Sequence, residues 1–216
     1  MPYLDKLKAV LIDFDGTLID SMPFLFQAYS VMLLKRGVTP TESEFRELTG
    51  PTIEEGVLLL QRRYGFNESV EEMLKEWRAS LAPLYEEEMV PLPGAMDCVG
   101  FLKKRFKVAL VTSAEKGLIE PFLKKSGLSF DLIVSKEDEL PSKPSPMPYQ
   151  EALRKLQVVS GEAIAIEDSE NGARAALSAG VFTLMLSRER TTLESENVRF
   201  VADWKQIKEY IESRYG

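Results

Sequence analysis

Histidine is missing altogether from this chain of 216 residues. Its absence excludes Ser-His-Asp and Cys-His catalytic triads, zinc sites with histidine ligands, and histidine general bases. Proton transfer must therefore involve Asp, Glu, Lys, Tyr or water. With carboxylates and hydroxyls as the available ligands, the sequence favours a hard divalent cation of the magnesium type.

Cysteine is almost as scarce, because Cys98 stands alone. A single thiol cannot form an internal disulfide, which agrees with a reducing cytoplasm. We expect Cys98 to be an inert thiol inside a helix. No apolar run approaches the roughly 18 residues that a membrane span needs, and the segment 1–8 is short and mixed in charge. We therefore expect a cytoplasmic protein without membrane association.

An excess of positive charge is also absent, since the formal net charge is −7. This balance argues against a general nucleic-acid binder and against binding to an anionic membrane surface. Any phosphate group must be held by local charge. Hydrophobic residues make up 44% of the chain, as in a folded globule. The sequence does not determine the oligomeric state, and we expect a monomer or a weak homo-oligomer.

The order of apolar runs predicts an α/β fold with a doubly wound parallel sheet. Helical segments separate the later runs, and strands that alternate with helices of this length are typical of such a sheet. The predicted strands span residues 9–12, 108–111, 131–134, 163–166 and 181–186.

A helical insertion interrupts this pattern after the first strand. Between residues 21 and 88 we find four helical stretches and no convincing strand, and two of the helices begin with Thr-x-x-Glu capping boxes at 41–44 and 52–55. We predict a core domain of residues 1–17 and 92–216 and a helical-bundle cap of residues 18–91. An insertion at the carboxyl end of a strand is placed to act as a lid over a ligand.

Two carboxylates follow the first strand at its carboxyl end. Residues i and i+2 of an extended segment project to the same side, so Asp13 and Asp15 begin as neighbours before the turn at Gly16. At effective dielectric constants of 80 to 20, two such charges repel each other by roughly 1 to 4 kcal/mol. A divalent cation, or a division into nucleophile and acid, would offset this repulsion; the alternative is a pair that caps the next turn.

Further polar residues follow later strands of the predicted sheet. In chain order they are Thr112, Ser113, Lys143, Glu167 and Asp168. Because the carboxyl ends of parallel strands share one edge, we expect these side chains to converge on Asp13 and Asp15. Each has a structural alternative: Thr112 and the Glu167-Asp168 pair could cap helices, and Lys143 could be a solvated surface lysine. Their joint occurrence favours phosphoryl chemistry, with the carboxylates balanced by a cation and a lysine.

These residues resemble, in order and context, the four motifs of the haloacid dehalogenase-like (HAD) hydrolase superfamily. The matching segments are Asp13-Phe14-Asp15-Gly16-Thr17-Leu18, Thr112, Lys143-Pro144 and Glu167-Asp168-Ser169. The resemblance covers the whole chain and is similar to the branch with a helical cap between the first two motifs. That branch includes phosphoglycolate phosphatases, sugar phosphatases and β-phosphoglucomutases.

The resemblance implies a Rossmann-like core and a magnesium-dependent phosphatase that hydrolyses a small phosphorylated metabolite, such as a sugar phosphate or a phosphoglycolate-like compound. It implies that Asp13 is the nucleophile, which forms an aspartyl-phosphate, and that Asp15 is the general acid and then the general base. In this family the Lys143-Pro144 bond is often cis.

The resemblance also implies the ligands of the phosphoryl group and of Mg²⁺. Thr112 and Lys143 would bind the phosphoryl group, with Ser113 and the Gly16 amide nearby. Mg²⁺ would be held by Asp13, by the main-chain carbonyl of Asp15, and by Asp168 with Glu167 as a further contact.

Departures from the family pattern bear on the substrate. Mutases of this branch carry a histidine and an arginine at the positions that align, from Asp13 and from Gly50, with Leu25 and Ile53. We therefore expect a phosphatase and keep a phosphotransferase of the β-phosphoglucomutase type as the alternative function. Phosphoglycolate phosphatases commonly show Asp-Ser-x-Pro-Asp, whereas this chain has Phe24 at the last position.

Two further alternatives remain open at this point. Phe24, Leu25 and Phe26 form either an apolar lip of the cap or part of its packing core. A phosphoacceptor module like a response-regulator receiver also uses acids, a hydroxyl and a lysine, but receivers are shorter and have no helical insertion. Asp15 argues against a haloacid dehalogenase, which lacks that second aspartate.

Overall fold

The computed structural model describes residues 6–48, 52–187, 193 and 195–215. Within these residues, parallel strands form one sheet in the order β3-β2-β1-β4-β5-β6. The strands are β1 (Ala9–Ile12), β2 (Lys107–Val111), β3 (Leu132–Val134), β4 (Ala163–Glu167), β5 (Phe182–Leu186) and β6 (Val198–Val201). This order confirms the predicted doubly wound sheet, whose direction of winding reverses between β1 and β4.

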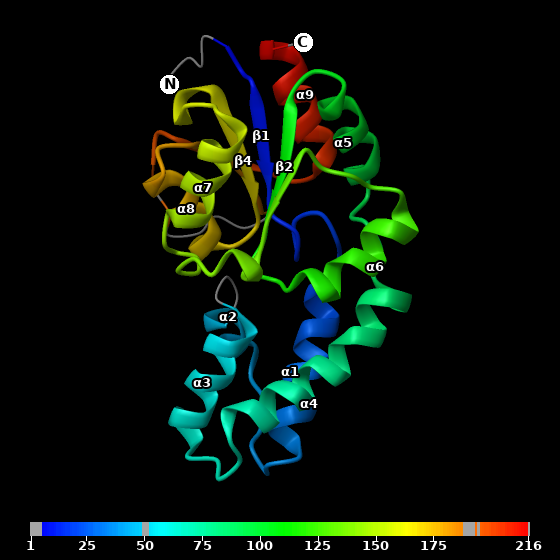
Figure 1. The fold of residues 1–216 in the computed structure, drawn as a ribbon, viewed down its shortest axis with the longest axis vertical. Helices are drawn as coiled ribbons and strands as arrows, with labels where there is room; N and C mark the ends of the chain where they lie inside the picture. Colours follow the sequence, from blue (N-terminus) through cyan, green and yellow to red (C-terminus); the bar gives the residue numbers. More distant parts are fainter. Residues whose placement is uncertain (1–5, 49–51, 188–192, 194, 216) are drawn as a thin grey trace.

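Helices cover both faces of the sheet, which explains why its central strands are apolar at almost every position. α7 (Met147–Leu156) and α8 (Glu170–Ser178) lie on one face, where Leu11 and Ala109 pack. α5 (Ala95–Lys103), α6 (Lys116–Ser126) and α9 (Trp204–Tyr215) lie on the other, where Val10 and Ile12 pack (Figure 1). Short 3-10 turns at Lys136–Asp138 and Ser160–Glu162 complete the described elements of this part.

The sixth strand was not predicted. β6 pairs with β5 at the edge of the sheet, with Val198 beside Thr183. Only Val201 of its four residues is buried, and Arg199 is exposed. A half-exposed edge strand therefore lacks the continuous apolar run that marked the central strands.

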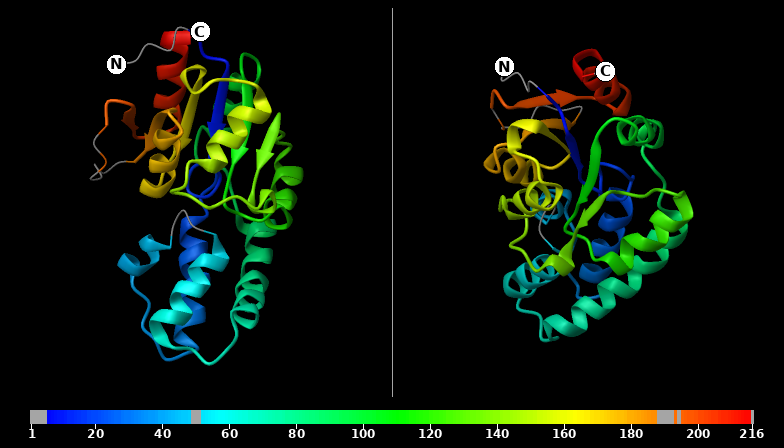
Figure 2. Two further views of the ribbon diagram at one scale, coloured as in Figure 1. Left: turned by 60° about the vertical axis from the view of Figure 1, so that its left-hand side comes forward. Right: turned by 45° about the horizontal axis from the view of Figure 1, so that its top comes forward.

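The insertion forms a group of helices beyond the carboxyl ends of the strands (Figures 1 and 2). These are α1 (Met22–Leu34), α2 (Glu42–Glu47), α3 (Ile53–Tyr64) and α4 (Val70–Pro83), followed by a π-helical turn, η1 (Leu84–Glu88). α4 packs against both α1 and α3. No strand occurs between residues 21 and 48 or between 52 and 88, as predicted.

One of the two predicted capping boxes forms completely. At the start of α3, Thr52 and Glu55 exchange both hydrogen bonds. At the start of α2, Thr41 accepts a bond from the Glu44 amide, but the Glu44 carboxylate accepts bonds from Tyr29 and Arg63 instead of closing the box. A tertiary contact therefore outweighs the local one.

Two linkers join the cap helices to the core, and they run side by side. The Asp20 amide donates to the Val90 carbonyl, and the Leu92 amide donates to the Leu18 carbonyl, both at 3.0 Å. This short antiparallel contact fixes the base of the insertion next to the carboxyl end of β1. We propose that the domain boundaries lie here, at 17/18 and 91/92.

Two smaller expectations are also met. Cys98 is buried in α5, and burial raises the pKa of its thiol to about 12, so the thiol stays protonated. The Lys143-Pro144 bond is cis. Among the described helices, none is both long and apolar enough to span a membrane.

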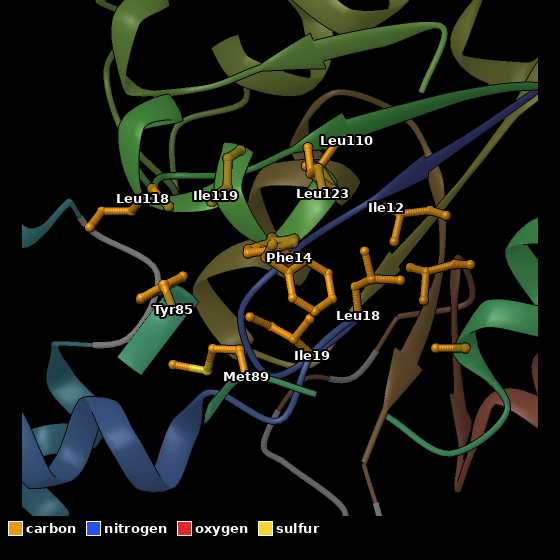
Figure 3. Packing of buried hydrophobic residues seen from close by; sticks show 14 of the residues in the cluster. Ile12, Phe14, Leu18, Ile19, Tyr85, Met89, Leu110, Leu118, Ile119 and Leu123 are labelled. Atoms are coloured by element: carbon orange, nitrogen blue, oxygen red, sulfur yellow. The ribbon is translucent and has the colours of Figure 1, made fainter. Parts of the chain in front are cut away.

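Phe14, between the two motif aspartates, anchors the catalytic loop in the core. Its side chain is fully buried and packs edge-on against Phe122 of α6 and beside Tyr85 of η1 (Figure 3). The buried ring fixes the backbone on either side of it. The packing of Phe14 therefore sets the positions of Asp13 and Asp15.

We predict that Phe14→Ala lowers the free energy of unfolding by about 3–5 kcal/mol, because it leaves a cavity in a dense core. Leu34→Ala, at a side chain that is 60% exposed, is the control and should change it by less than about 0.5 kcal/mol. Urea denaturation followed by circular dichroism measures both. Equal losses in the two variants would show that Phe14 is not a core anchor.

Candidate active site

One cavity lies between the carboxyl edge of the sheet and the cap helices, and it gathers most of the predicted site residues. Asp13, Asp15, Thr112, Ser113, Lys143 and Asp168 line it. Gly16 and Glu167 do not line it. Asp13 and Asp15 follow β1, Thr112 follows β2 and Asp168 follows β4, so three adjacent parallel strands deliver the groups to one place.

The turn after β1 depends on glycine. The Asp13 amide donates to the Ile166 carbonyl at 3.0 Å, which extends the pairing of β1 with β4 by one residue. Gly16 then has φ +78°, and a Cβ there would lie 2.2 Å from Oδ2 of Asp168. Glycine is needed for both the left-handed conformation and the close approach to Asp168. The Gly16 amide donates to the Ile19 carbonyl, so its contact with a phosphoryl group stays a prediction.

Lys143 is the central cation of the site. Its ammonium donates to Oδ1 of Asp13 and Oε1 of Glu167, both at 2.6 Å, and to the Val111 carbonyl at 3.0 Å. Burial opposes the charged form, but the two carboxylates outweigh it and raise the pKa of Lys143 above its ordinary value. The side chain is 2% exposed, so the alternative of a solvated surface lysine is wrong.

Glu167 is completely buried behind this lysine. Its Oε1 accepts hydrogen bonds from Lys143 and from the hydroxyl of Tyr149, whereas Oε2 has no partner among the described residues. Burial and the nearby charge of Asp13 raise the pKa of Glu167 to about 7. A Cβ on Gly172 would lie 2.1 Å from Oε2, so the first turn of α8 comes close to this carboxylate only because residue 172 is glycine.

Asp168 completes a group of three carboxylates. Its Oδ1 accepts a hydrogen bond from the Thr17 hydroxyl at 3.1 Å. Burial, Asp13 and Glu167 all raise the pKa of Asp168 well above its ordinary value. Ser169, not the Glu167-Asp168 pair, caps α8 by accepting the Gly172 amide. The alternative of a capping role for the two acids is therefore wrong.

The three carboxylates fit a hard divalent cation. Ligand oxygens of Asp13, Glu167 and Asp168 all lie within 4.8 Å of one another. Among the described residues, Lys143 is the cation that binds this group, and Oε2 of Glu167 has no partner. Such an all-oxygen, anionic donor set suits Mg²⁺, and the Asp15 carbonyl stays a predicted further ligand.

Asp15 has a different environment from the other acids. Its Oδ1 accepts a hydrogen bond from the hydroxyl of Tyr85 at 2.5 Å. Burial, assisted by the charge of Asp13, raises the pKa of Asp15 to about 6, although the hydrogen bond from Tyr85 opposes the shift. Such a carboxyl can hold a proton at a higher pH than an ordinary aspartate, as a group that donates and then accepts a proton requires.

Thr112 and Ser113 lie at the end of β2. Thr112 is 5% exposed, and its hydroxyl oxygen accepts the Ala114 amide at 3.0 Å. Glu115, not Thr112, is the residue that precedes α6 at the N-cap, so the alternative in which Thr112 caps that helix is wrong. Among the described residues no acceptor binds the hydroxyl hydrogen of Thr112, and its bond to a phosphoryl oxygen stays a prediction.

The sequence analysis missed the tyrosines of the site. Tyr85 lies 70 residues after Asp15 and Tyr149 lies 18 residues before Glu167. Neither follows a predicted strand, and each reads as an ordinary apolar position of its helix. Only the tertiary fold brings them to the carboxylates.

The apolar stretch near the start of α1 divides between the two roles that were left open. Leu25 lines the cavity. Phe26 packs against Tyr29 and Phe45 inside the cap, with ring centroids 5.8 and 5.3 Å apart. The stretch thus serves partly as a wall of the cavity and partly as cap core.

Three polar contacts join the cap helices to loops of the core. Arg78 of α4 binds Glu115 with both an Nε and an Nη donor, the shortest at 2.6 Å. Glu54 of α3 pairs with Lys136 at 2.7 Å, and Glu55 accepts a bond from Ser142. The structure is therefore one in which the cap lies against the core.

The fold, the motif positions and the cavity together define a Rossmann-like α/β core with a helical cap. A family model described as haloacid dehalogenase-like hydrolase matches residues 10–186. The chain belongs to this family.

Relatives with named activities agree with that assignment. A phosphorylated carbohydrates phosphatase of Thermotoga maritima is 32% identical over 178 residues, which cover 81% of this chain and 82% of that one. Hexitol phosphatase B of Escherichia coli is 30% identical and covers 84% of each chain. The β-phosphoglucomutase structure of Clostridium difficile superposes with a TM-score of 0.83 at 25% identity, covering 97% of each chain.

We predict that Mg²⁺ raises the melting temperature, and more at pH 8 than at pH 6. The raised pKa values of Glu167 and Asp168 mean that the folded protein holds protons that the unfolded chain releases. Their stabilising effect is therefore present at low pH and is lost as pH rises through about 7. A cation competes with these protons and binds best once they have left.

Thermal unfolding with and without Mg²⁺ checks this prediction. At a tenfold excess of Mg²⁺ over its dissociation constant, the rise should be about 3–6 °C. Asp168→Asn should abolish the rise, while Asp97→Asn, at an exposed aspartate of α5, should keep it. A shift that is unchanged in Asp168→Asn would place the cation elsewhere.

Proposed function

We propose that this protein is a Mg²⁺-dependent phosphatase that hydrolyses a small phosphomonoester through an aspartyl-phosphate on Asp13. The observation that carries the proposal is the convergence of Asp13, Asp15, Thr112 and Lys143 on one cavity beside the Asp168 carboxylate. The names of the relatives support this class, and sugar phosphates and phosphoglycolate are the first substrates to test.

The first step transfers the phosphoryl group to Asp13. Lys143 holds Oδ1 of Asp13 and so orients the carboxylate, whose other oxygen attacks phosphorus. The bond between phosphorus and the alcohol oxygen breaks, and Asp15 gives its proton to that oxygen. Thr112 donates a hydrogen bond to a phosphoryl oxygen, and the Lys143 ammonium supplies positive charge at the same place.

The second step releases phosphate. Asp15, now ionised, takes a proton from a water molecule, and the resulting hydroxide attacks the phosphorus of the aspartyl-phosphate. The acyl phosphate bond breaks and the Asp13 carboxylate is restored. Mg²⁺ bound by Asp13, the Asp15 carbonyl, Asp168 and Glu167 would offset the repulsion between these acids and the phosphoryl oxygens.

Phosphotransfer to an acceptor is the second candidate, and the similarity to the β-phosphoglucomutase structure favours it. Against it stand Leu25 and Ile53, which line the cavity at the positions that align with the histidine and arginine of mutases. The Gly50 used for that alignment lies outside the described residues. Product analysis with a sugar acceptor separates the two, since hydrolysis yields inorganic phosphate and a mutase yields a phosphorylated acceptor.

We predict that Asp13→Asn lowers kcat by at least about 10³-fold, because an amide is a poor nucleophile and residues of one catalytic unit fail together. Phosphate release from a panel of phosphomonoesters, with Mg²⁺ and with chelator, measures this. Asp97→Asn carries the same chemical change on the exposed surface of α5 and should keep full activity. Substantial turnover by Asp13→Asn, or turnover in chelator, would contradict the proposal.

We also predict that Tyr85→Phe lowers kcat by about 10-fold or more while KM changes little. Its hydroxyl holds Asp15, and hydrogen bonds to charged groups contribute about 1.5–3 kcal/mol. Tyr85 is thus a positioning residue. The matched control is Tyr64→Phe, which removes a hydroxyl that binds Glu44 inside the cap. A raised KM with unchanged kcat would show instead that Tyr85 only contacts the substrate.

A further inference from the structure

The cavity has two walls of unlike chemistry. The wall from the sheet carries the carboxylates, Lys143 and the hydroxyl groups of Thr112, Ser113 and Ser169. The wall from the cap is built largely from apolar side chains, listed here in chain order: Met22, Leu25, Phe45, Leu48, Ile53 and Trp77. A phosphoryl group at the sheet therefore leaves the rest of its ester against the apolar wall.

Two hydroxyl groups beside the cap wall are already engaged, whereas the indole Nε1 of Trp77 has no partner among the described residues. The Thr52 hydroxyl donates to Glu55 and accepts the Glu55 amide. The Tyr85 hydroxyl donates to Asp15. They have little capacity left to bind the hydroxyl groups of a substrate.

Cations are also lacking on that side. Of the described residues that line the cavity, Lys143 is the only one with a positive charge, and three protein oxygens already accept its hydrogen bonds. Three cap arginines lie near the wall in sequence and face carboxylates: Arg46 is 4.0 Å from Glu42, Arg63 pairs with Glu44 and Glu47, and Arg78 pairs with Glu115. Among the described residues, a second anionic group on the substrate would find no unpaired cation at this wall.

We propose that the alcohol released from the substrate is small, uncharged and largely apolar. This inference rests on the proposed phosphatase activity and narrows its substrate class. It disfavours esters with a carboxylate, a second phosphate or several hydroxyl groups. The cavity volume of about 100 Å³ is below the about 150 Å³ of an engineered cavity that holds benzene, so a short alkyl chain is the group that fits beside the phosphoryl group.

The test compares substrates of matched shape. Isobutyl phosphate carries an isopropyl group in place of the carboxylate of phosphoglycolate, and n-propyl phosphate lacks the two free hydroxyl groups of glycerol 3-phosphate. We expect kcat/KM to favour the apolar member of each pair by about 100-fold, because an apolar pocket rejects an added hydroxyl by about that factor. Hydroxyl substituents make an alcohol a better leaving group, so intrinsic reactivity works against this result. Equal values, or a preference for the polar members, would overturn the inference.

Acetyl phosphate distinguishes failure of the substrate inference from failure of the proposed phosphatase function. Its leaving group is small and a weak base, so its hydrolysis reports on the phosphoryl site with little help from the cap. Hydrolysis of acetyl phosphate with a preference for phosphoglycolate over isobutyl phosphate would overturn the substrate class alone. No hydrolysis of acetyl phosphate or of any ester would overturn the phosphatase and, with it, the inference.

A cation placed in the cap wall should change the selectivity. Ile53→Lys supplies a partner for a carboxylate, so the ratio of kcat/KM for phosphoglycolate to that for isobutyl phosphate should rise by at least about 10-fold. Ile53→Met is the matched control and should leave the ratio unchanged. Leu25→Lys repeats the test from α1 should Ile53→Lys fail to fold. If the ratio stays the same in a lysine variant that folds, the cap wall does not contact the alcohol part of the substrate, and the inference is contradicted.

Discussion

The buried ammonium of Lys143, held between the carboxylates of Asp13 and Glu167, is the interaction on which the rest of the site depends. Two adjacent strand ends, those of β1 and β4, bring four acids to one edge of the sheet, and the mutual repulsion of these acids would otherwise oppose folding. A single buried cation offsets part of that charge. The negative charge that Lys143 does not offset contributes to the raised pKa values of Glu167 and Asp168. A divalent cation at this place would offset it.

The fold supplies the positions that this charge balance needs. The ring of Phe14 fixes the loop after β1 from inside the core, Gly16 lets the backbone approach Asp168, and Gly172 lets α8 approach Glu167. The paired linkers at Asp20 and Val90 set the cap over the same edge. The charged wall and the apolar wall of the cavity thus come from two separate parts of the chain.

The sequence predicted those residues whose positions follow from local pattern. Strand ends are recognisable from apolar runs, so Asp13, Thr112 and Asp168 could be placed at one edge from the order of residues alone. Lys143 lies within the loop that follows the predicted strand 131–134, and this position in the chain was enough to expect it at the same edge. Tyr85 could not be predicted, because its contact with Asp15 spans 70 residues and depends on the return path from the cap. Glu44 fits a capping box by sequence, yet binds Tyr29 and Arg63 once the cap has packed.

The central claim is that Asp13 carries the phosphoryl group during turnover. Acid quenching of a single turnover, reduction of any acyl phosphate with borohydride and peptide mass spectrometry would locate it directly. The account predicts a modified residue at position 13 and at no other carboxylate, formed before phosphate appears in solution. Release of phosphate with no modified residue at position 13, or modification of another acid, would contradict it.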